Sequence, residues 1–159
     1  MKKILVAVFL IGMIQFQVFG QGDYRTSIGV RGAPSSGLTL KHFATNNVSY
    51  EGILSTRWGG FTLTGLYQLN QQAFGTQKWN FFYGVGGHVG YWDGNQNHPW
   101  FDDDDDYVVA GIDGIIGLEF TFESIPFNAS LDWKPAFNIA SYTGFWVDEI
   151  AISLRYIIN

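Results

Sequence analysis

The sequence predicts an all-β protein, built as an eight-stranded antiparallel up-and-down β-barrel. Eight segments alternate apolar and polar side chains with a two-residue period, and no segment has the periodicity of a long helix. Glycine and aromatic residues are abundant, with 20 Gly, 14 Phe, 8 Tyr and 6 Trp, as is typical of strands and tight turns. Charged residues make up only 14% of the chain, against about 25% in soluble proteins, which disfavours an ordinary charged surface.

Residues 1–20 are expected to be a cleaved signal peptide. Two lysines precede the apolar run Ile4–Ile14, and Gly20 supplies a small residue at a plausible cleavage point. The run is too short for the roughly 20 residues of a membrane-spanning helix. The remaining residues, 21–159, are expected to form one barrel domain. They carry seven basic and 14 acidic residues, and this acidic balance disfavours a nucleic-acid partner.

The predicted strands are separated by segments rich in Gly, Pro, Asn, Asp and Ser, which favour turns. In order along the chain, the strands are Tyr24–Gly32, Gly37–Phe43, Val48–Trp58, Phe61–Asn70, Asn80–Trp92, Tyr107–Phe122, Phe127–Phe137 and Asp148–Ile158. The turn signals between them are Gly32–Gly37, Asn46–Asn47, Gly59–Gly60, Asp93–Asn95 and Ser124–Pro126.

Each strand is assigned because one of its faces is apolar and the other is small, polar or charged. In the first four strands the apolar positions include Ile28, Val30, Leu38, Leu40, Tyr50, Leu54, Trp58, Phe61, Leu63, Tyr67 and Leu69. In the fifth, Gly84, Gly86, His88 and Gly90 share the small and polar face. In the last three the apolar positions include Val108, Ile112, Ile116, Leu118, Phe120, Phe127, Leu131, Trp133, Ile150, Ile152, Leu154 and Tyr156.

The distribution of charge predicts which face points inward. Six of the seven basic residues after the signal peptide fall on the polar face, together with four acids. Mixed charges diluted with Gly, Ser and Thr are typical of a paired network in a narrow lumen, so the apolar face is expected to meet lipid. The predicted lumen network is Arg25, Arg31, Lys41, Glu51, Arg57, Asp113, Glu119, Asp132, Lys134 and Arg155.

Strand length and strand number predict the topology of a transmembrane barrel. About 9 to 11 residues per strand suffice to cross a bilayer, and an even number of strands returns both termini to one side, the periplasm. The connections Asp93–Asp106 and Ala140–Val147 are then extracellular. Aromatic residues are expected at two levels: Tyr24, Phe120, Phe122, Phe127 and Tyr156 on the periplasmic side, and Trp58, Phe61, Tyr91, Trp92 and Tyr107 on the outer side.

With this pattern the chain resembles the small eight-stranded outer-membrane β-barrels of Gram-negative bacteria, the class of the outer membrane protein X and A barrels. The resemblance is clearest in Gly111–Glu119 (GIDGIIGLE) and Leu131–Phe137 (LDWKPAF). It implies a location in the outer membrane and, as partners, outer-membrane lipid, lipopolysaccharide and the barrel assembly machinery. The C-terminus departs from the class, which usually ends on an aromatic residue, because this chain ends in Tyr156–Asn159 (YIIN).

Candidate chemistry is sparse, and we expect no catalytic residue, cofactor or dedicated metal site. The acidic run Asp102, Asp103, Asp104, Asp105 and Asp106 is a candidate for weak cation binding. It lacks the alternating spacing and glycine turn of a defined calcium loop. His88 is expected to be a hydrogen-bonded lumen residue, and His42 to lie at headgroup level near a strand end, where a polar group on the lipid face is tolerated.

The sequence therefore predicts a non-enzymatic outer-membrane protein, a membrane scaffold whose acidic, aromatic outer loops contact an unidentified extracellular or membrane protein. Eight strands close around side chains, which disfavours a diffusion pore. One alternative is a lipid-A-modifying enzyme, but neither His42 nor His88 has a serine two residues further along its strand. A second is a secreted lipocalin-like binder of a small ligand, which would need an apolar interior and a charged exterior.

Overall fold

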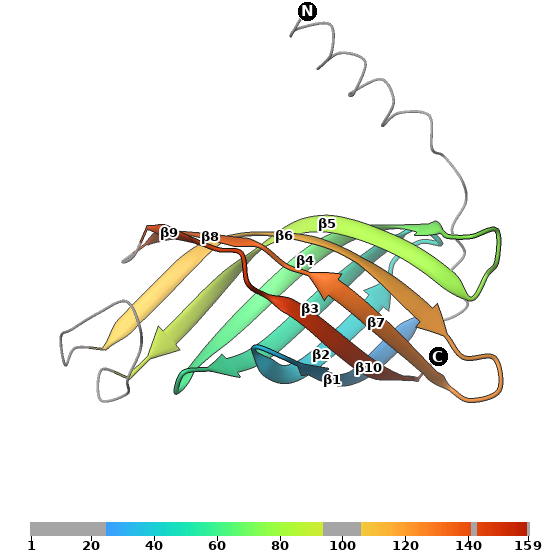
Figure 1. Ribbon diagram of the computed structural model, residues 1–159, viewed down its shortest axis with the longest axis horizontal. Helices are drawn as coiled ribbons and strands as arrows, with labels where there is room; N and C mark the ends of the chain where they lie inside the picture. The colour runs from blue at the N-terminus through green and yellow to red at the C-terminus, as the bar shows by residue number, and fades with distance from the viewer. Residues whose placement is uncertain (1–24, 94–105, 141–142, 159) are drawn as a thin grey trace, which may run out of the picture.

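A computed structural model describes residues 25–93, 106–140 and 143–158 of the chain as a closed antiparallel β-barrel (Figure 1). The signal peptide expected at 1–20 and Tyr24 lie outside these residues. The strands in the described part of the chain are β1 Thr26–Gly32, β2 Ser36–Phe43, β3 Val48–Arg57, β4 Gly60–Gln72, β5 Trp79–Trp92, β6 Tyr107–Thr121, β7 Phe127–Trp133, β8 Ala136–Ala140, β9 Gly144–Trp146 and β10 Ile150–Ile157.

These ten strands make the eight staves of the barrel, a stave being one strand position around the ring, because β7 and β8 lie end to end in one stave and β9 and β10 in another. β7 and β8 both pair with β6 and are separated by Pro135, which has no N–H to give to the ladder. The carbonyl of Pro135 still accepts a hydrogen bond of 2.8 Å from the Gly114 N–H. Each stave pairs with the next in sequence order, and β1 pairs with β10, with Ile28 opposite Tyr156, to close the ring. The prediction of an all-β, eight-stranded antiparallel barrel is confirmed.

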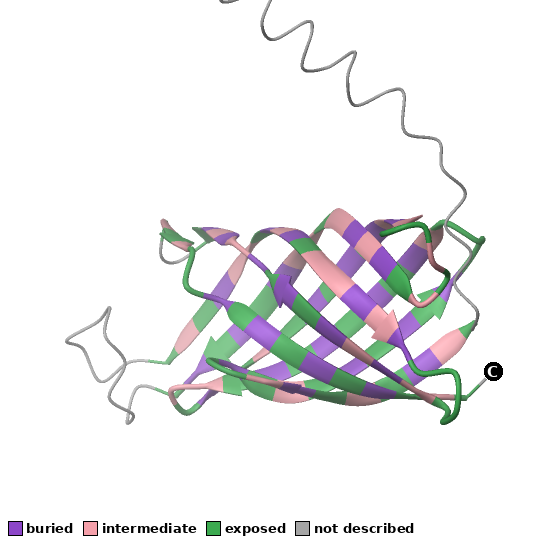
Figure 2. Ribbon diagram, turned by 45° about the vertical axis from the view of Figure 1, so that its right-hand side comes forward, coloured by how far each residue is buried: buried purple, intermediate pink, exposed green. Residues whose placement is uncertain are grey.

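The apolar face of the strands points outward and the polar face points inward. Burial therefore alternates residue by residue along the strands, as Figure 2 shows by its repeating colours. In β10 the fully buried Arg155 is preceded by Leu154, which is 46% exposed. No helix in the described residues is long and apolar enough to cross a membrane.

The two ends of the barrel differ. The end where β1 begins and β10 finishes, which we call the terminal end, also holds the turns 44–47, 73–78 and 122–126. Aromatic pairs gather there, with ring centroids 4.9 Å apart for Trp79 and Phe120 and 5.4 Å apart for Phe127 and Tyr156. The opposite end, the loop end, holds the turns 33–35 and 58–59 and the long connection between β5 and β6.

Three details of the loop end differ from the sequence predictions. The connection predicted over Ala140–Val147 contains β9, which pairs with β8 and extends the sheet beyond Pro135. The turn between β3 and β4 is Trp58–Gly59 rather than Gly59–Gly60, and both turn residues have positive φ, as two-residue hairpins of type I′ require. Trp92 is buried and points inward, where its Nε1 donates a hydrogen bond of 3.0 Å to the Arg57 carbonyl, so it is not part of the outer aromatic belt.

Close strand approach on the inner face at Gly29 generates a testable prediction. A Cβ at Gly29 would lie 1.9 Å from the Leu154 carbonyl oxygen, so Gly29→Ala must push β1 from β10 and is expected to cost about 1 to 3 kcal/mol of unfolding free energy. Gly52→Ala is the matched control, because a Cβ at Gly52 meets no atom within 4 Å. Denaturant titration of both refolded variants measures the difference, and equal stability would contradict the close approach at the β1–β10 seam.

Candidate functional site: the charged lumen

The lumen of the barrel holds a cluster of charges near the terminal end, centred on Arg155. This guanidinium contacts Glu51 on β3 and lies 3.5 Å from Glu119 Oε2 on β6. Glu119 also accepts a 3.1 Å contact from Lys41 Nζ on β2. The side chains of all four are fully buried. Two positive and two negative charges from four strands are therefore neutralised within one site.

Neutral polar side chains complete this terminal-end cluster. Gln68 Nε2 and Thr39 Oγ1 each donate a hydrogen bond of 2.5 Å to Glu51. Asn70 accepts a bond of 3.0 Å from Lys41 Nζ, and Ser130 accepts one of 2.9 Å from Arg155. A buried charge is tolerated only when its hydrogen-bonding capacity is used, and these partners use it.

A second charge cluster lies toward the loop end. Arg31 on β1 donates two hydrogen bonds of 2.7 Å to the two carboxylate oxygens of Asp132 on β7, the bidentate geometry that a planar guanidinium favours. Lys134 Nζ bridges Asp113 at 3.0 Å and Glu149 at 3.2 Å. The Ser35 hydroxyl donates a bond of 2.7 Å to Glu149. This cluster joins β1 to β7 through Arg31 and Asp132. It joins the segment between β7 and β8 to β6 through Lys134 and Asp113.

His88 is held at the loop end of the same cluster. Its Nδ1 lies 2.8 Å from Asp113 Oδ2, and its Nε2 lies 2.7 Å from Asn138 Oδ1. Its ring stacks on Trp146 at 5.8 Å between centroids, and Trp146 in turn meets Trp92 edge to face at 5.6 Å. Both ring nitrogens of His88 are thus engaged, and Trp146 covers one face of the imidazole.

Apolar side chains occupy the lumen between the clusters. Ile53, Leu66, Phe82 and Ile115 pack together from four successive strands and are almost completely buried. Lys41 Nζ lies 4.4 Å from the centroid of the Phe82 ring, which joins this apolar cluster to the terminal-end charges. Buried side chains therefore fill the middle of the barrel in the part of the chain that the structure describes.

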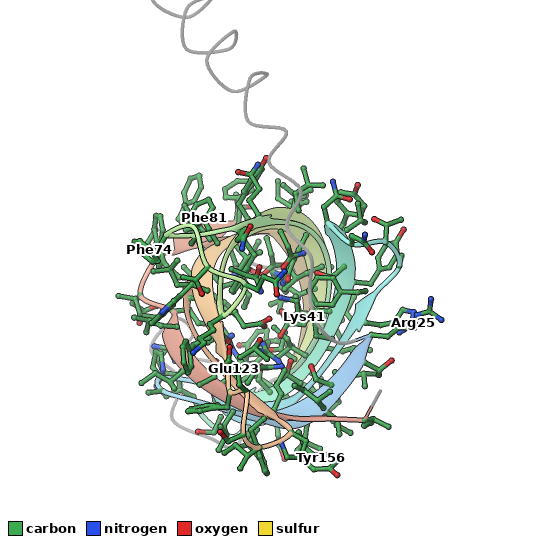
Figure 3. The ribbon with its side chains drawn as sticks, turned by 90° about the vertical axis from the view of Figure 1, so that its right-hand side faces the viewer. Arg25, Lys41, Phe74, Phe81, Glu123 and Tyr156 are labelled. Carbon is green, nitrogen blue, oxygen red and sulfur yellow. The ribbon has the colours of Figure 1, made fainter. Side chains whose placement is uncertain are left out.

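Eight of the ten predicted network residues lie in the two clusters, and two lie elsewhere. Arg57 sits at the loop-end rim, where it pairs with Asp148 at 2.5 Å, the two side chains being 15% and 60% exposed. Its guanidinium also lies 3.6 Å from the Trp58 ring. Arg25 is exposed at the terminal end and projects outside the ring of strands in Figure 3, whereas Lys41 lies within it. The inclusion of Arg25 was wrong, because the first strand begins only at Thr26.

The prediction omitted two members of the loop-end cluster. Glu149 was not included in the predicted network. The alternation of β10, extended by one residue from Ile150, nevertheless puts Glu149 on the inner face. His88 was expected to be hydrogen-bonded in the lumen, but its partners Asp113 and Asn138 lie on other strands and were not foreseen.

The acidic run contributes one described residue, Asp106. It is exposed and accepts a hydrogen bond of 2.7 Å from the Tyr91 hydroxyl. Asp102–Asp105 lie outside the described residues. Within 25–93, 106–140 and 143–158 no group of three or more His, Asp or Glu side chains is arranged to hold a metal ion.

The electrostatics of the rim differ from those of the lumen. At the loop end, the hydrogen bonds from Arg57 hold the pKa of Asp148 below its ordinary value of 3.8. Partial exposure keeps this pair in contact with solvent, which screens it and limits its contribution to stability. The lumen pairs are shielded, so they carry the larger share of the electrostatic constraint on the fold.

Comparison with known proteins assigns the chain to no family. No protein-family model matches the chain, and no curated protein is significantly similar to it.

Three of the four arginines, Arg155, Arg57 and Arg25, provide a graded test of the lumen network. Arg155→Ala leaves Glu51 with a buried, uncompensated charge and is expected to cost about 3 to 5 kcal/mol of unfolding free energy. Arg57→Ala at the rim should cost about 1 kcal/mol or less, and Arg25→Ala on the exposed segment should cost about 0.5 kcal/mol or less. Denaturant titration of the refolded variants gives the order, and a neutral Arg155→Ala would refute the buried pairing.

Proposed function

We propose that this protein is an integral outer-membrane β-barrel that acts without enzymatic activity, as a membrane scaffold and surface interaction protein. The observation that carries the proposal is the distribution of side chains over the closed barrel. Large apolar side chains such as Val30, Leu38, Leu63 and Ile152 are more than half exposed, while Arg155, Lys41 and Glu119 are fully buried. A soluble barrel of this size would be expected to have the reverse arrangement.

The outward apolar surface is too extensive for a monomer in water. Exposed large apolar side chains occur on every stave of the barrel, whereas soluble monomers rarely expose contiguous apolar patches larger than a few hundred Å². Lipid chains remove this cost, and a closed ring satisfies the backbone groups that lipid cannot bond. The same argument counts against the lipocalin-like alternative, because a binder of apolar ligands needs an apolar lumen.

The filled lumen supports a scaffold rather than a pore or an enzyme. Phe82 and its apolar neighbours occupy the middle of the barrel, with ion pairs on both sides. His88 has both ring nitrogens engaged by Asp113 and Asn138, so the imidazole has no free nitrogen with which to activate a nucleophile. Recognition of a partner then falls to the loop end, through the acidic and aromatic connection between β5 and β6.

We further propose that the terminal end faces the periplasm. Both ends of the barrel domain lie there, together with three turns of at most six residues. The longest connection, Asp93–Asp106, leaves the opposite end, which matches the asymmetry of outer-membrane barrels. Outer-membrane lipid and lipopolysaccharide would surround the strands, and the barrel assembly machinery would insert them.

Leu154→Arg tests the membrane assignment. Leu154 is 46% exposed on the outward face near the middle of β10, so an arginine there should cost about 2 to 4 kcal/mol if that face meets the bilayer centre. Ile125→Arg is the matched control, because Ile125 is 49% exposed in a turn beyond the strands. The fraction of folded, heat-modifiable protein inserted into lipid vesicles is measured by unheated gel electrophoresis. Recovery of the wild type in the soluble periplasmic fraction, or equal insertion of both variants, would overturn the proposal.

Proteolysis of intact cells tests the orientation. Protease added outside is expected to cleave within Asp93–Asp106, because this connection of 14 residues lies between the long strands β5 and β6. The turn 73–78 at the terminal end should be cut only after the outer membrane is permeabilised. Cleavage at 73–78 in intact cells, with Asp93–Asp106 spared, would show that the barrel has the opposite orientation.

A further inference from the structure

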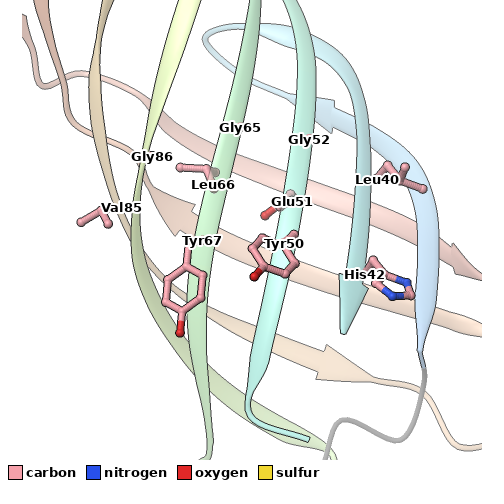
Figure 4. A pocket seen from close by; sticks show the side chains of 10 residues that line it. All are labelled: Leu40, His42, Tyr50, Glu51, Gly52, Gly65, Leu66, Tyr67, Val85 and Gly86. Carbon is pink, nitrogen blue, oxygen red and sulfur yellow. The ribbon is translucent and has the colours of Figure 1, made fainter. Parts of the chain in front are cut away.

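The outward face of the barrel contains a groove over β2 to β5 where side chains are missing. Its floor is formed by Gly52 on β3 and Gly65 on β4, which are direct partners in the antiparallel ladder. Figure 4 shows these glycines side by side, with no side chain above them. The groove, which we call the glycine notch, has a volume of about 460 Å³. This volume lies within the roughly 300 to 1,000 Å³ of typical small-ligand pockets.

The register places apolar side chains on three sides of the glycine notch. Toward the terminal end stand Tyr50 and Tyr67, whose rings meet edge to face at 5.7 Å. Toward the loop end stand Leu54 and Leu63, which are paired and half exposed. Leu40 on β2 is paired with Gly52 and closes one flank. The notch is therefore a depression in the apolar surface that is bounded on three sides and open toward β5, where Gly65 is paired with Gly87.

The notch is wide enough for a single hydrocarbon chain but too narrow for a helix. Tyr50 and Leu54 are four residues apart on one strand, so their backbone positions are separated by about 13 Å, and their side chains narrow the opening further. A helix with its side chains is about 10 to 12 Å wide and would not reach the floor. A single hydrocarbon chain is narrower and matches the apolar walls.

A histidine, His42, at the edge of the notch indicates that the molecule with this hydrocarbon chain also has a polar headgroup. His42 is exposed on the same outward face and is paired with Tyr50, at the side of the notch nearest the terminal end. Its Nδ1 lies 2.9 Å from the Thr26 hydroxyl. When that hydroxyl donates to Nδ1, the neutral ring carries its proton on Nε2. His42 Nε2 has no protein partner among the described residues, and a polar group on a lipid-facing surface costs free energy unless something bonds it.

We propose that the glycine notch and His42 form a binding site for one glycerophospholipid of the leaflet at the terminal end. One acyl chain lies across Gly52 and Gly65, and a phosphate oxygen accepts a hydrogen bond from His42 Nε2. Exposed Arg25, one residue before Thr26, adds a positive charge at the same end of the barrel. This inference rests on the proposed membrane location and adds a specific lipid site to it.

Filling the notch tests the acyl-chain half of the proposal. Gly65→Leu places a side chain where a Cβ meets no atom within 4 Å, so the strand is not displaced. Gly32→Leu is the matched control, because Gly32 is also free of contacts and is paired with the outward-facing Ile152. Each protein is inserted into vesicles of palmitoyl-oleoyl phosphatidylcholine and phosphatidylglycerol and then extracted in mild detergent. The phospholipids that it retains are counted by native mass spectrometry.

The wild type and Gly32→Leu are expected to retain one phospholipid, and Gly65→Leu none. His42→Phe keeps an apolar ring but removes the donor, so it should lower phospholipid affinity about tenfold. It should leave unchanged the weaker binding of the matching diacylglycerol, which has no phosphate. Equal retention by Gly65→Leu and Gly32→Leu, or no retention by a fully inserted wild type, would overturn the lipid site alone. Failure of the wild type to insert would instead overturn the proposed function.

Discussion

Ion pairs inside the lumen, between strands that are not neighbours in the sheet, are the interaction on which the rest of the structure depends. Arg155 on β10 reaches Glu51 on β3, and Arg31 on β1 reaches Asp132 on β7. These residues are separated by 104 and 101 positions in the sequence. Backbone ladders join each strand only to its neighbours, whereas these pairs join strands that are two or three places apart in the ring. Because a buried charge without its partner is costly, the pairs favour one register and one closure of the ring.

The position of the charges also determines what the surface can be. Once the polar face of every strand is committed to the lumen, the apolar face must point outward, since successive side chains in a strand alternate. Placing Arg155 inside therefore places Leu154 and Tyr156 outside. Burial of charge and exposure of apolar side chains are thus two consequences of one pattern, and a bilayer is the environment in which both are favourable.

The interior divides the barrel into regions with different physical properties. The terminal-end cluster has equal numbers of positive and negative charges, from Lys41, Arg155, Glu51 and Glu119, and is sealed from solvent. Phe82 and its neighbours block the middle. The loop-end cluster approaches solvent through the rim pair of Arg57 and Asp148. The two charge clusters and the apolar cluster thus join the strands in the body of the barrel, whereas the rim at the loop end is open to solvent.

The sequence by itself determined the strands and their faces, because both depend on the local two-residue alternation. It correctly placed Arg31, Lys41 and Asp132 inside and Leu38 and Ile152 outside. The apolar lumen residue Ile53 could also have been found, because it shares the inner face with Glu51 and Ser55.

Only the tertiary structure decided which charges meet and where each strand ends. The Arg31–Asp132 pair depends on the stagger of strands around the closed ring, which no local pattern encodes. Arg25 follows the alternation but lies beyond the first ladder pair, so it is exposed. Glu149 continues the inward alternation of β10, but its partner Lys134 lies between β7 and β8, and no local pattern brings the two residues together. Side-chain direction is a property of neighbouring residues, whereas pairing across a lumen is a property of the closed barrel.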